Sequence, residues 1–412
     1  MTKLLLIFLF CYPLSALGSY ANFNSILIGE RAAGLGGAFT ALTGDPSACA
    51  FYNPATMSRM EGHTLSAAVN LYNKYATHFG TDQDFAEAPL RINQGTIVPV
   101  PSSSGSVYSF RNFALGLSIT SPDFNTFTGD VEKTSSNTTF INLRDESLWV
   151  GGTISLNLTE KDSIGFTLYY TSHTNNLLTT SRSVNGSVIT VSTEEKSFSH
   201  NSLVYILGYF RQLSPHWTTG LSVRLPSLPI SGDGSLHRFS VSTDGTSTFP
   251  DDINSKLVLS RIPAKATFGI AYEIPYSWLV SLDLNYYKNE EYYEFENSLT
   301  SDKNTHKDTW NVNLGGEYFF KDWLALRLGL FTNNSSAAEI PDVVSIRMLD
   351  HIPMWGFSAN VAIYTSKNTR FTLGGYYTGG QGWSTQGISG ALAKVPKSVQ
   401  IFSFLVGTTF QL

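Results

Sequence analysis

The sequence predicts an all-β protein: a 14-stranded antiparallel transmembrane β-barrel with an N-terminal hatch inside its lumen. Three observations predict this fold. Apolar and polar residues alternate along most of the chain after residue 62. The alternating segments are joined by short and long links in turn, and residues 19–62 are rich in Gly and Ala without alternating.

The composition sets the chain apart from an ordinary soluble domain. Charged residues make up 14% of its 412 residues, against about 25% in a typical soluble domain. Aromatic residues reach 13%, and the net charge of −5 is mild. Because the sequence has no basic stripe, we expect no nucleic-acid partner.

The chain begins with a predicted signal peptide. Residues 1–18 contain Lys3, a long apolar run and then small residues, which is the pattern of a secretory signal, and cleavage is expected after Gly18 or Ala21. Its removal leaves Cys49 as the single cysteine, so no internal disulfide is expected. No later apolar run is long enough to predict a transmembrane helix.

The segment 278–287 illustrates the predicted strands. One face carries its apolar side chains, which are Trp278, Val280, Leu282 and Leu284. The other face is polar, with Ser281, Asp283 and Asn285. A membrane barrel places the apolar face against lipid and the polar face against the lumen. The alternative is a large soluble β-protein with one dry face, but its outer face would be rich in Lys and Glu.

Fourteen such segments are predicted, and the links between them alternate in length. The segments are 63–72, 94–100, 111–121, 147–159, 163–173, 200–212, 216–226, 263–275, 277–288, 308–320, 322–332, 354–365, 369–378 and 398–411. The long links are 122–146, 174–199, 227–262, 289–307, 333–353 and 379–397. Short turns at one rim, long loops at the other and an even strand count are typical of outer-membrane barrels. Trp217, Trp278 and Trp323 each open a strand after a short turn, as an interfacial aromatic girdle requires.

Residues 19–62 form the predicted hatch, and residues 63–412 form the barrel. The stretch GLGGAF (34–39) is not a dinucleotide fingerprint, because Phe39 occupies the third glycine position and no strand precedes it. A segment of such small residues can pack inside a lumen, where irregular backbone is tolerated.

The same residues resemble a known family. The stretches RAAGLGGAFTAL (31–42), GDPSA (44–48) and FYNPATMSRM (51–60) resemble the N-terminal hatch of the FadL/TodX (OmpP1) outer-membrane transporters. Asn53, Pro54 and Ala55 match that family's Asn-Pro-Ala triplet. Residues 261–289 and 311–331 resemble its C-terminal strands.

The resemblance implies a monomeric, multi-pass barrel of the outer membrane whose lumen is blocked by a gating hatch containing Asn53, Pro54 and Ala55. It also implies transport of long-chain fatty acids or other hydrophobic compounds. These would be captured at the extracellular loops, held in an apolar pocket and released when the hatch shifts. Release is lateral in that family, at a kinked third strand, and Gly116 or Pro122 is a candidate for the kink. The alternative is a FadL-fold, PorV-like secretion or assembly partner without transport activity.

Candidate substrate-binding residues lie in two places. Phe23, Ile26 and Leu27 belong to the mature N-terminus, and Leu228 and Ile230 belong to a long link. Simple packing of the hatch or of the loop is the alternative role for each. We therefore expect a hydrophobic small molecule and outer-membrane lipid as partners.

Charged lumen residues could clamp a carboxylate ligand or form structural salt bridges; the candidates are Arg31, Arg224 and Arg327. The eight histidines are scattered, and neither an HExxH nor a GxSxG motif occurs. We therefore predict no catalytic residues, no metal and no cofactor.

Overall fold

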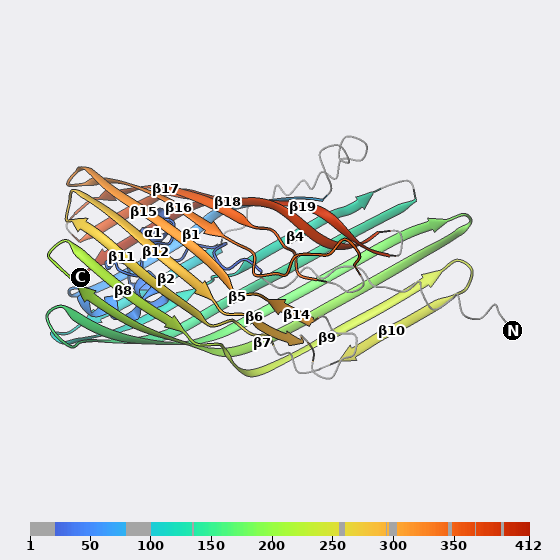
Figure 1. Ribbon diagram of the computed structural model, residues 1–412, viewed down its shortest axis with the longest axis horizontal. Coiled ribbons are helices and arrows are strands. Elements are labelled where there is room, and N and C mark those ends of the chain that lie inside the picture. Colours follow the sequence, from blue (N-terminus) through green and yellow to red (C-terminus); the bar gives the residue numbers. More distant parts are fainter. Residues whose placement is uncertain are drawn as a thin grey trace.

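The computed structural model describes residues 21–79, 100–133, 136–254, 260–293, 295, 303–344, 348–366, 368–388 and 391–412. The predicted signal peptide lies outside these residues. The described chain forms an elongated barrel with a few short helices inside one end (Figure 1). Those helices are α1 (Glu30–Gly34), α2 (Pro46–Tyr52) and η1 (Pro54–Arg59).

Fourteen antiparallel strands close the barrel, as the sequence predicts. They are β1 (His63–Phe79), β2 (Val100–Ser109), β3 (Phe113–Thr120), β5 (Asn137–Asn157), β6 (Asp162–Asn185), β7 (Val188–Gln212), β8 (Trp217–Arg224), β11 (Lys265–Ile274), β12 (Trp278–Tyr287), β15 (Thr309–Lys321), β16 (Leu324–Asn333), β17 (Met354–Tyr364), β18 (Thr369–Ile388) and β19 (Ala391–Gln411). Closure comes from β1, which pairs with β2 on one side and with β19 on the other. The soluble β-protein alternative is wrong, because the outer face of this barrel is apolar.

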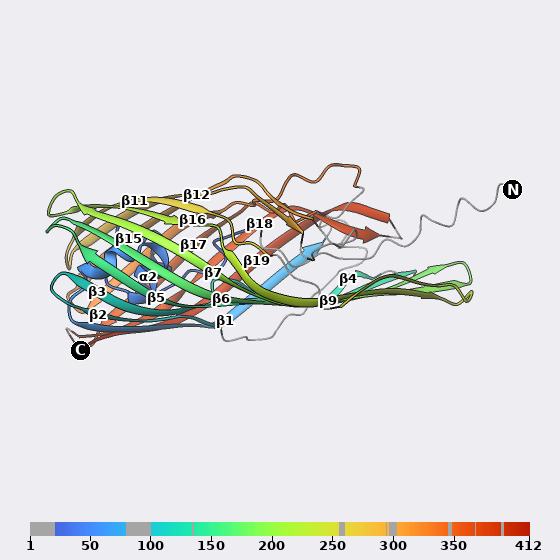
Figure 2. The same cartoon turned by 90° about the horizontal axis from the view of Figure 1, so that it is seen from below.

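Several predicted long loops are strands. Strands β5, β6 and β7 continue far beyond the rest of the wall (Figures 1 and 2). A two-residue turn that contains Gly186, with a φ of 60°, joins β6 to β7 at their tip. Further strands accompany them or lie in other long links; these are β4 (Phe124–Lys133), β9 (Leu228–Ser242), β10 (Ser247–Asn254), β13 (Glu290–Tyr293) and β14 (Lys303–His306). Their Thr, Val, Ile, Phe and Tyr residues favour strands, but without an apolar stripe the alternation does not reveal them.

Strand β2 is also displaced from its predicted position. The prediction placed it at 94–100, and the structure begins it at Val100; residues 94–99 lie outside the described residues. Its sequence, VPSSSGSVYS, has the composition of a linker. The small residues are needed because α2 packs directly on it: a Cβ atom at Gly105 would collide with the backbone at Ser47.

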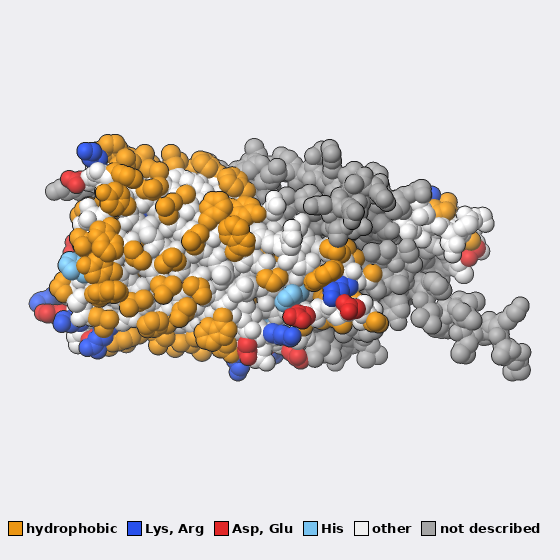
Figure 3. Space-filling model, turned by 45° about the horizontal axis from the view of Figure 1, so that its top comes forward, with side chains coloured by type: hydrophobic (Ala, Val, Ile, Leu, Met, Phe, Trp, Pro, Cys, Tyr) orange, Lys and Arg blue, Asp and Glu red, His pale blue; other side chains and the backbone are white. Residues whose placement is uncertain are grey.

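The strands are apolar outside and polar inside. In β12, Val280, Leu282 and Leu284 are exposed on the outer surface, whereas Ser281 and Asp283 are buried in the interior. On the face shown in Figure 3, hydrophobic side chains cover the half of the molecule that has the short turns, with charged side chains at its rim. This layout suits a barrel surrounded by lipid.

The predicted aromatic girdle is present at the short-turn rim. The rings of Trp217 and Trp278 contact Tyr272, with centroid distances of 5.0 and 4.9 Å. Trp323 is exposed on the turn between β15 and β16. Rings with one apolar and one polar side are favoured at the headgroup level of a bilayer, so this rim lies at a membrane interface.

Replacing one lipid-facing residue tests the orientation of the wall. Leu328 is 54% exposed, whereas its neighbour Arg327 is fully buried in the interior. We expect Leu328→Arg to lower the free energy of unfolding by about 2–4 kcal/mol if the residue lies near the bilayer midplane. Urea titration of the barrel in lipid vesicles measures this loss, with Leu328→Met as the matched control. Equal stability of the two variants would contradict the inside-out assignment.

Candidate functional site

Residues 21–62, here called the N-terminal segment, fold through local capping signals. Asp45 caps α2, accepting hydrogen bonds from the backbone of Ser47 at 3.1 Å and Ala48 at 3.3 Å. Asn53 caps η1 in the same way, through the backbone N–H of Ala55 at 3.1 Å. A proline follows each cap at the first helical position, where its missing N–H costs nothing.

The N-terminal segment is fastened to the barrel wall by buried hydrogen bonds. The Asn53 amide donates to the carbonyl oxygens of Thr40 at 2.7 Å and Tyr209 at 3.0 Å. The Ala55 carbonyl accepts from Ser155 at 3.0 Å and Ser163 at 2.8 Å. Asn53, Pro54 and Ala55, predicted as hatch residues, are all buried against β5, β6 and β7.

Glycines in the wall make this contact possible. A Cβ atom at Gly208 would collide with the Asn53 side chain, and one at Gly165 would collide with the backbone of Pro54. The wall therefore approaches the segment more closely than any other residue would allow. The surfaces of the segment and the wall are therefore complementary in shape.

A buried ion network joins α1 to β15, β16 and β18. Arg327 donates to Glu30 at 3.0 Å and also contacts Glu317. Arg31 reaches Glu317 at 2.8 Å, and Arg370 donates to Glu30 at 2.7 Å through its Nε. Every charge in this network faces an opposite charge, so burial does not leave one uncompensated.

The N-terminal segment lies between two hollows of the lumen. One hollow, on the short-turn side, is lined by turn residues such as Glu61, Pro275 and Asn368. The other, here called the loop-side pocket, is lined by Pro122, Ser260 and other residues towards the long extensions. A molecule that travels along the barrel axis therefore meets the segment.

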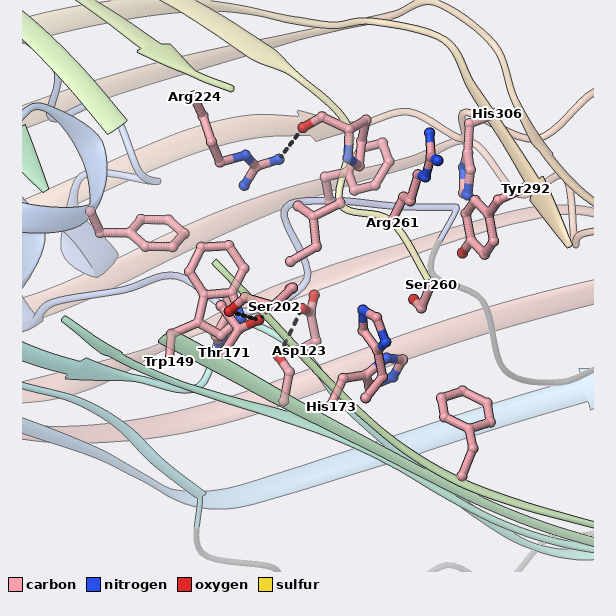
Figure 4. Close-up of a pocket in the computed structure, with 18 residues that line it drawn as sticks. Asp123, Trp149, Thr171, His173, Ser202, Arg224, Ser260, Arg261, Tyr292 and His306 are labelled. Carbon is pink, nitrogen blue, oxygen red and sulfur yellow. Dashed lines mark hydrogen bonds between the residues drawn. The ribbon is translucent and has the colours of Figure 1, made fainter. Parts of the chain in front are cut away.

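The loop-side pocket combines aromatic and polar walls. Phe23 stacks on Tyr287 with 4.6 Å between centroids, and Phe51 lies 5.7 Å from Trp149. Figure 4 shows Arg224 and His306 on one side of the hollow, with Asp123 and other polar groups across from them. Such a mixture of apolar surface and a few placed polar groups is typical of small-molecule sites.

Burial shifts the pKa values of titratable side chains at the pocket. Burial raises the pKa of the Asp123 carboxyl, against the opposing effect of the hydrogen bond from Ser147. Burial lowers the pKa of His306 to about 4, so its imidazole is neutral at pH 7. The Arg224 guanidinium lies over Trp149, 5.8 Å from the ring centroid, and donates to the Pro263 carbonyl at 3.3 Å.

The five predicted substrate-binding residues do not come together. Phe23 lines the loop-side pocket. Ile26 and Leu27 are buried in two apolar clusters that the N-terminal segment forms with the barrel wall. Leu228 and Ile230 are about half exposed on β9, outside the pocket lining.

The three candidate arginines also lie in different places. Arg31 and Arg327 belong to the ion network, and Arg224 lines the pocket.

Sequence reasoning missed Trp149 and His173 as pocket residues. The alternation of inward and outward positions along β5 could have identified Trp149 as a lumen residue, because Leu148 and Val150 on either side of it face outward.

Other kinds of site find no support in the part of the chain that the structure describes. No group of three or more His, Cys, Asp or Glu residues there could hold a metal ion. No helix among those residues is long and apolar enough to cross a membrane.

Comparison with known proteins places the chain in a family. Residues 16–351 match the family described as outer membrane protein transport protein (OMPP1/FadL/TodX). No curated protein sequence matches the chain.

Solved structures share the fold. A Pseudomonas aeruginosa FadL homologue superposes with a TM-score of 0.70 at 14% identity, over 98% of this chain and 99% of that one. The Pseudomonas putida toluene transporter TodX gives a TM-score of 0.67 at 14% identity, over 95% and 99%. The CymD monoaromatic hydrocarbon channel gives 0.64 at 16% identity, over 95% and 99%. Taken with the sequence match, the chain belongs to the OMPP1/FadL/TodX family of outer-membrane transport proteins and is a transport channel rather than an enzyme.

Proposed function

We propose that this protein carries hydrophobic small molecules across the outer membrane. A molecule is captured at the long extensions, held in the loop-side pocket, and released after the N-terminal segment shifts as a hatch. The observation that carries this proposal is the position of the N-terminal segment between the aromatic pocket and the hollow at the short turns. Long-chain fatty acids and single-ring hydrocarbons are both candidate substrates.

Release through the wall is the alternative to passage along the lumen. Strands β3 and β4 both pair with β5, through Thr120 with Trp149 and through Phe124 with Glu146. Residues 121–123 therefore stand opposite only two residues of β5, which makes a bulge at Pro122 beside the pocket. Gly116, the other candidate for a kink, lies in an uninterrupted ladder.

Uptake by cells tests the proposal. Cells that lack their own channel of this family, with and without this protein, are given radiolabelled oleate or toluene. We expect the protein to raise the initial uptake rate of at least one of them. Uptake equal to that of the empty cells for both compounds, with correctly folded protein in the outer membrane, would contradict transport and favour the secretion or assembly role.

A further inference from the structure

We infer that the loop-side pocket selects a single-ring aromatic compound that carries a neutral hydroxyl group, a phenol, over the plain hydrocarbon of the same shape. This rests on the proposed function and narrows its substrate class. Two buried hydrogen-bond donors without partners, beside aromatic rings and a carboxylate, carry the inference.

The walls of the pocket suit an aromatic ring. Its lining includes the rings of Phe23, Phe51, Trp149, Phe198 and Tyr292, which come from the N-terminal segment, β5, β7 and β13. Its cavity volume is about 70 Å³. An apolar cavity of about 150 Å³ holds benzene, so even one ring requires neighbouring side chains to move.

Two donors at the pocket have no acceptor among the described residues. The indole Nε1 of Trp149 is unpartnered, and that side chain is 1% exposed. The Nε of Arg224 is also buried and unpartnered. The two side chains are neighbours, since the guanidinium lies 5.8 Å from the indole centroid. A buried donor without a partner is costly, so a ligand that brings an oxygen atom gains relative to one that does not.

The carboxylate of Asp123 decides which oxygen group suits the site. Its Oδ2 accepts a hydrogen bond from Ser147 at 2.9 Å, and the residue lines the same pocket. An anionic carboxylate ligand could accept from Arg224, but it has no proton to donate to Asp123. A phenolic hydroxyl is both donor and acceptor, so it can accept from Trp149 or Arg224 and donate to Asp123.

Binding of three matched ligands tests the inference in purified, detergent-solubilised protein. Toluene is the hydrocarbon, 4-methylphenol adds a hydroxyl to it, and 4-methylbenzoate adds a carboxylate instead. By calorimetry we expect 4-methylphenol to bind at least about tenfold more tightly than toluene, as one hydrogen bond to a charged or buried partner provides. We expect 4-methylbenzoate to bind more weakly than 4-methylphenol.

Trp149→Phe removes the indole N–H and keeps an aromatic ring. We expect this variant to lose part of the preference for 4-methylphenol, because Arg224 remains as a donor, while its affinity for toluene stays near the wild-type value. The matched control is Trp310→Phe, because Trp310 is 61% exposed on the outer surface of β15. This control should leave all three affinities unchanged.

The outcomes separate the inference from the proposed function. Equal binding of toluene and 4-methylphenol to the wild type would overturn the inference, and this result needs no variant. Tightest binding of 4-methylbenzoate would overturn it too, and would make Arg224 an anion clamp. A Trp149→Phe variant that weakens both neutral ligands alike would also overturn it. In each case the proposed function stands if cells with the protein take up any hydrophobic substrate, and it fails if they take up none.

Discussion

Deleting residues 22–55 is expected to leave a folded barrel that conducts small ions and solutes freely. The ladders that close the wall run from strand to strand and do not pass through the N-terminal segment. The inner face that the deletion uncovers includes polar residues such as Ser155, Asp283 and Asn313. Water can therefore replace the hydrogen bonds that the segment now makes.

Single-channel recording in planar bilayers measures this effect. The variant that lacks residues 22–55 should show a stable open conductance, whereas the full-length protein should be closed to small solutes. A matched control removes residues 243–246, the exposed turn between β9 and β10, which leaves the N-terminal segment in place. If the deletion variant folds and conducts no more than the full-length protein, the hatch hypothesis is wrong.

Arg327→Met is expected to lower the free energy of unfolding by about 3–5 kcal/mol, which is the usual effect of removing one partner from a buried ion pair. Arg327 has no solvent exposure and bridges Glu30 of α1 to Glu317 of β15. Its loss leaves those carboxylates with less compensation, although Arg370 and Arg31 still contact them. The N-terminal segment should loosen together with the wall.

Urea titration in lipid vesicles, followed by tryptophan fluorescence, gives the free energy for this variant. Arg327→Lys keeps the charge but not the planar, forked donors, so it should lose less stability than Arg327→Met. Leu328→Met changes the adjacent lipid-facing position and should have little effect. Wild-type stability of Arg327→Met would show that the network does not hold the segment in place.

The number of strands and the placement of apolar side chains on the outer face were predictable, because both follow from the alternation of side chains along a strand. In the middle of β12 the outward residues Val280 and Leu282 alternate with the inward Ser281 and Asp283. In β16 the outward Leu328 follows the inward Arg327, so the alternation reports the structure directly. The extensions of β5, β6 and β7 were missed because both of their faces are mixed in polarity. The turn Gly186-Ser187 was the local signal for the β6–β7 hairpin.

The site was less predictable than the fold. Phe23, predicted from its place in the apolar N-terminus, lines the loop-side pocket, whereas Leu228 and Ile230, predicted from an apolar loop, lie outside its lining. Apolar character alone does not distinguish a residue that faces a ligand from one that faces solvent. The neighbours across the lumen decide this, and they come from strands distant in the sequence.

The sequence by itself determined that the chain alternates, closes into an even-stranded barrel and carries a small-residue segment ahead of it, because each of these depends on local periodicity or composition. Only the tertiary structure decided that Arg31 and Arg327 pair with carboxylates while Arg224 and Trp149 meet at a pocket. Such contacts join residues of different strands, and their distances depend on how the barrel curves and on where the N-terminal segment rests inside it.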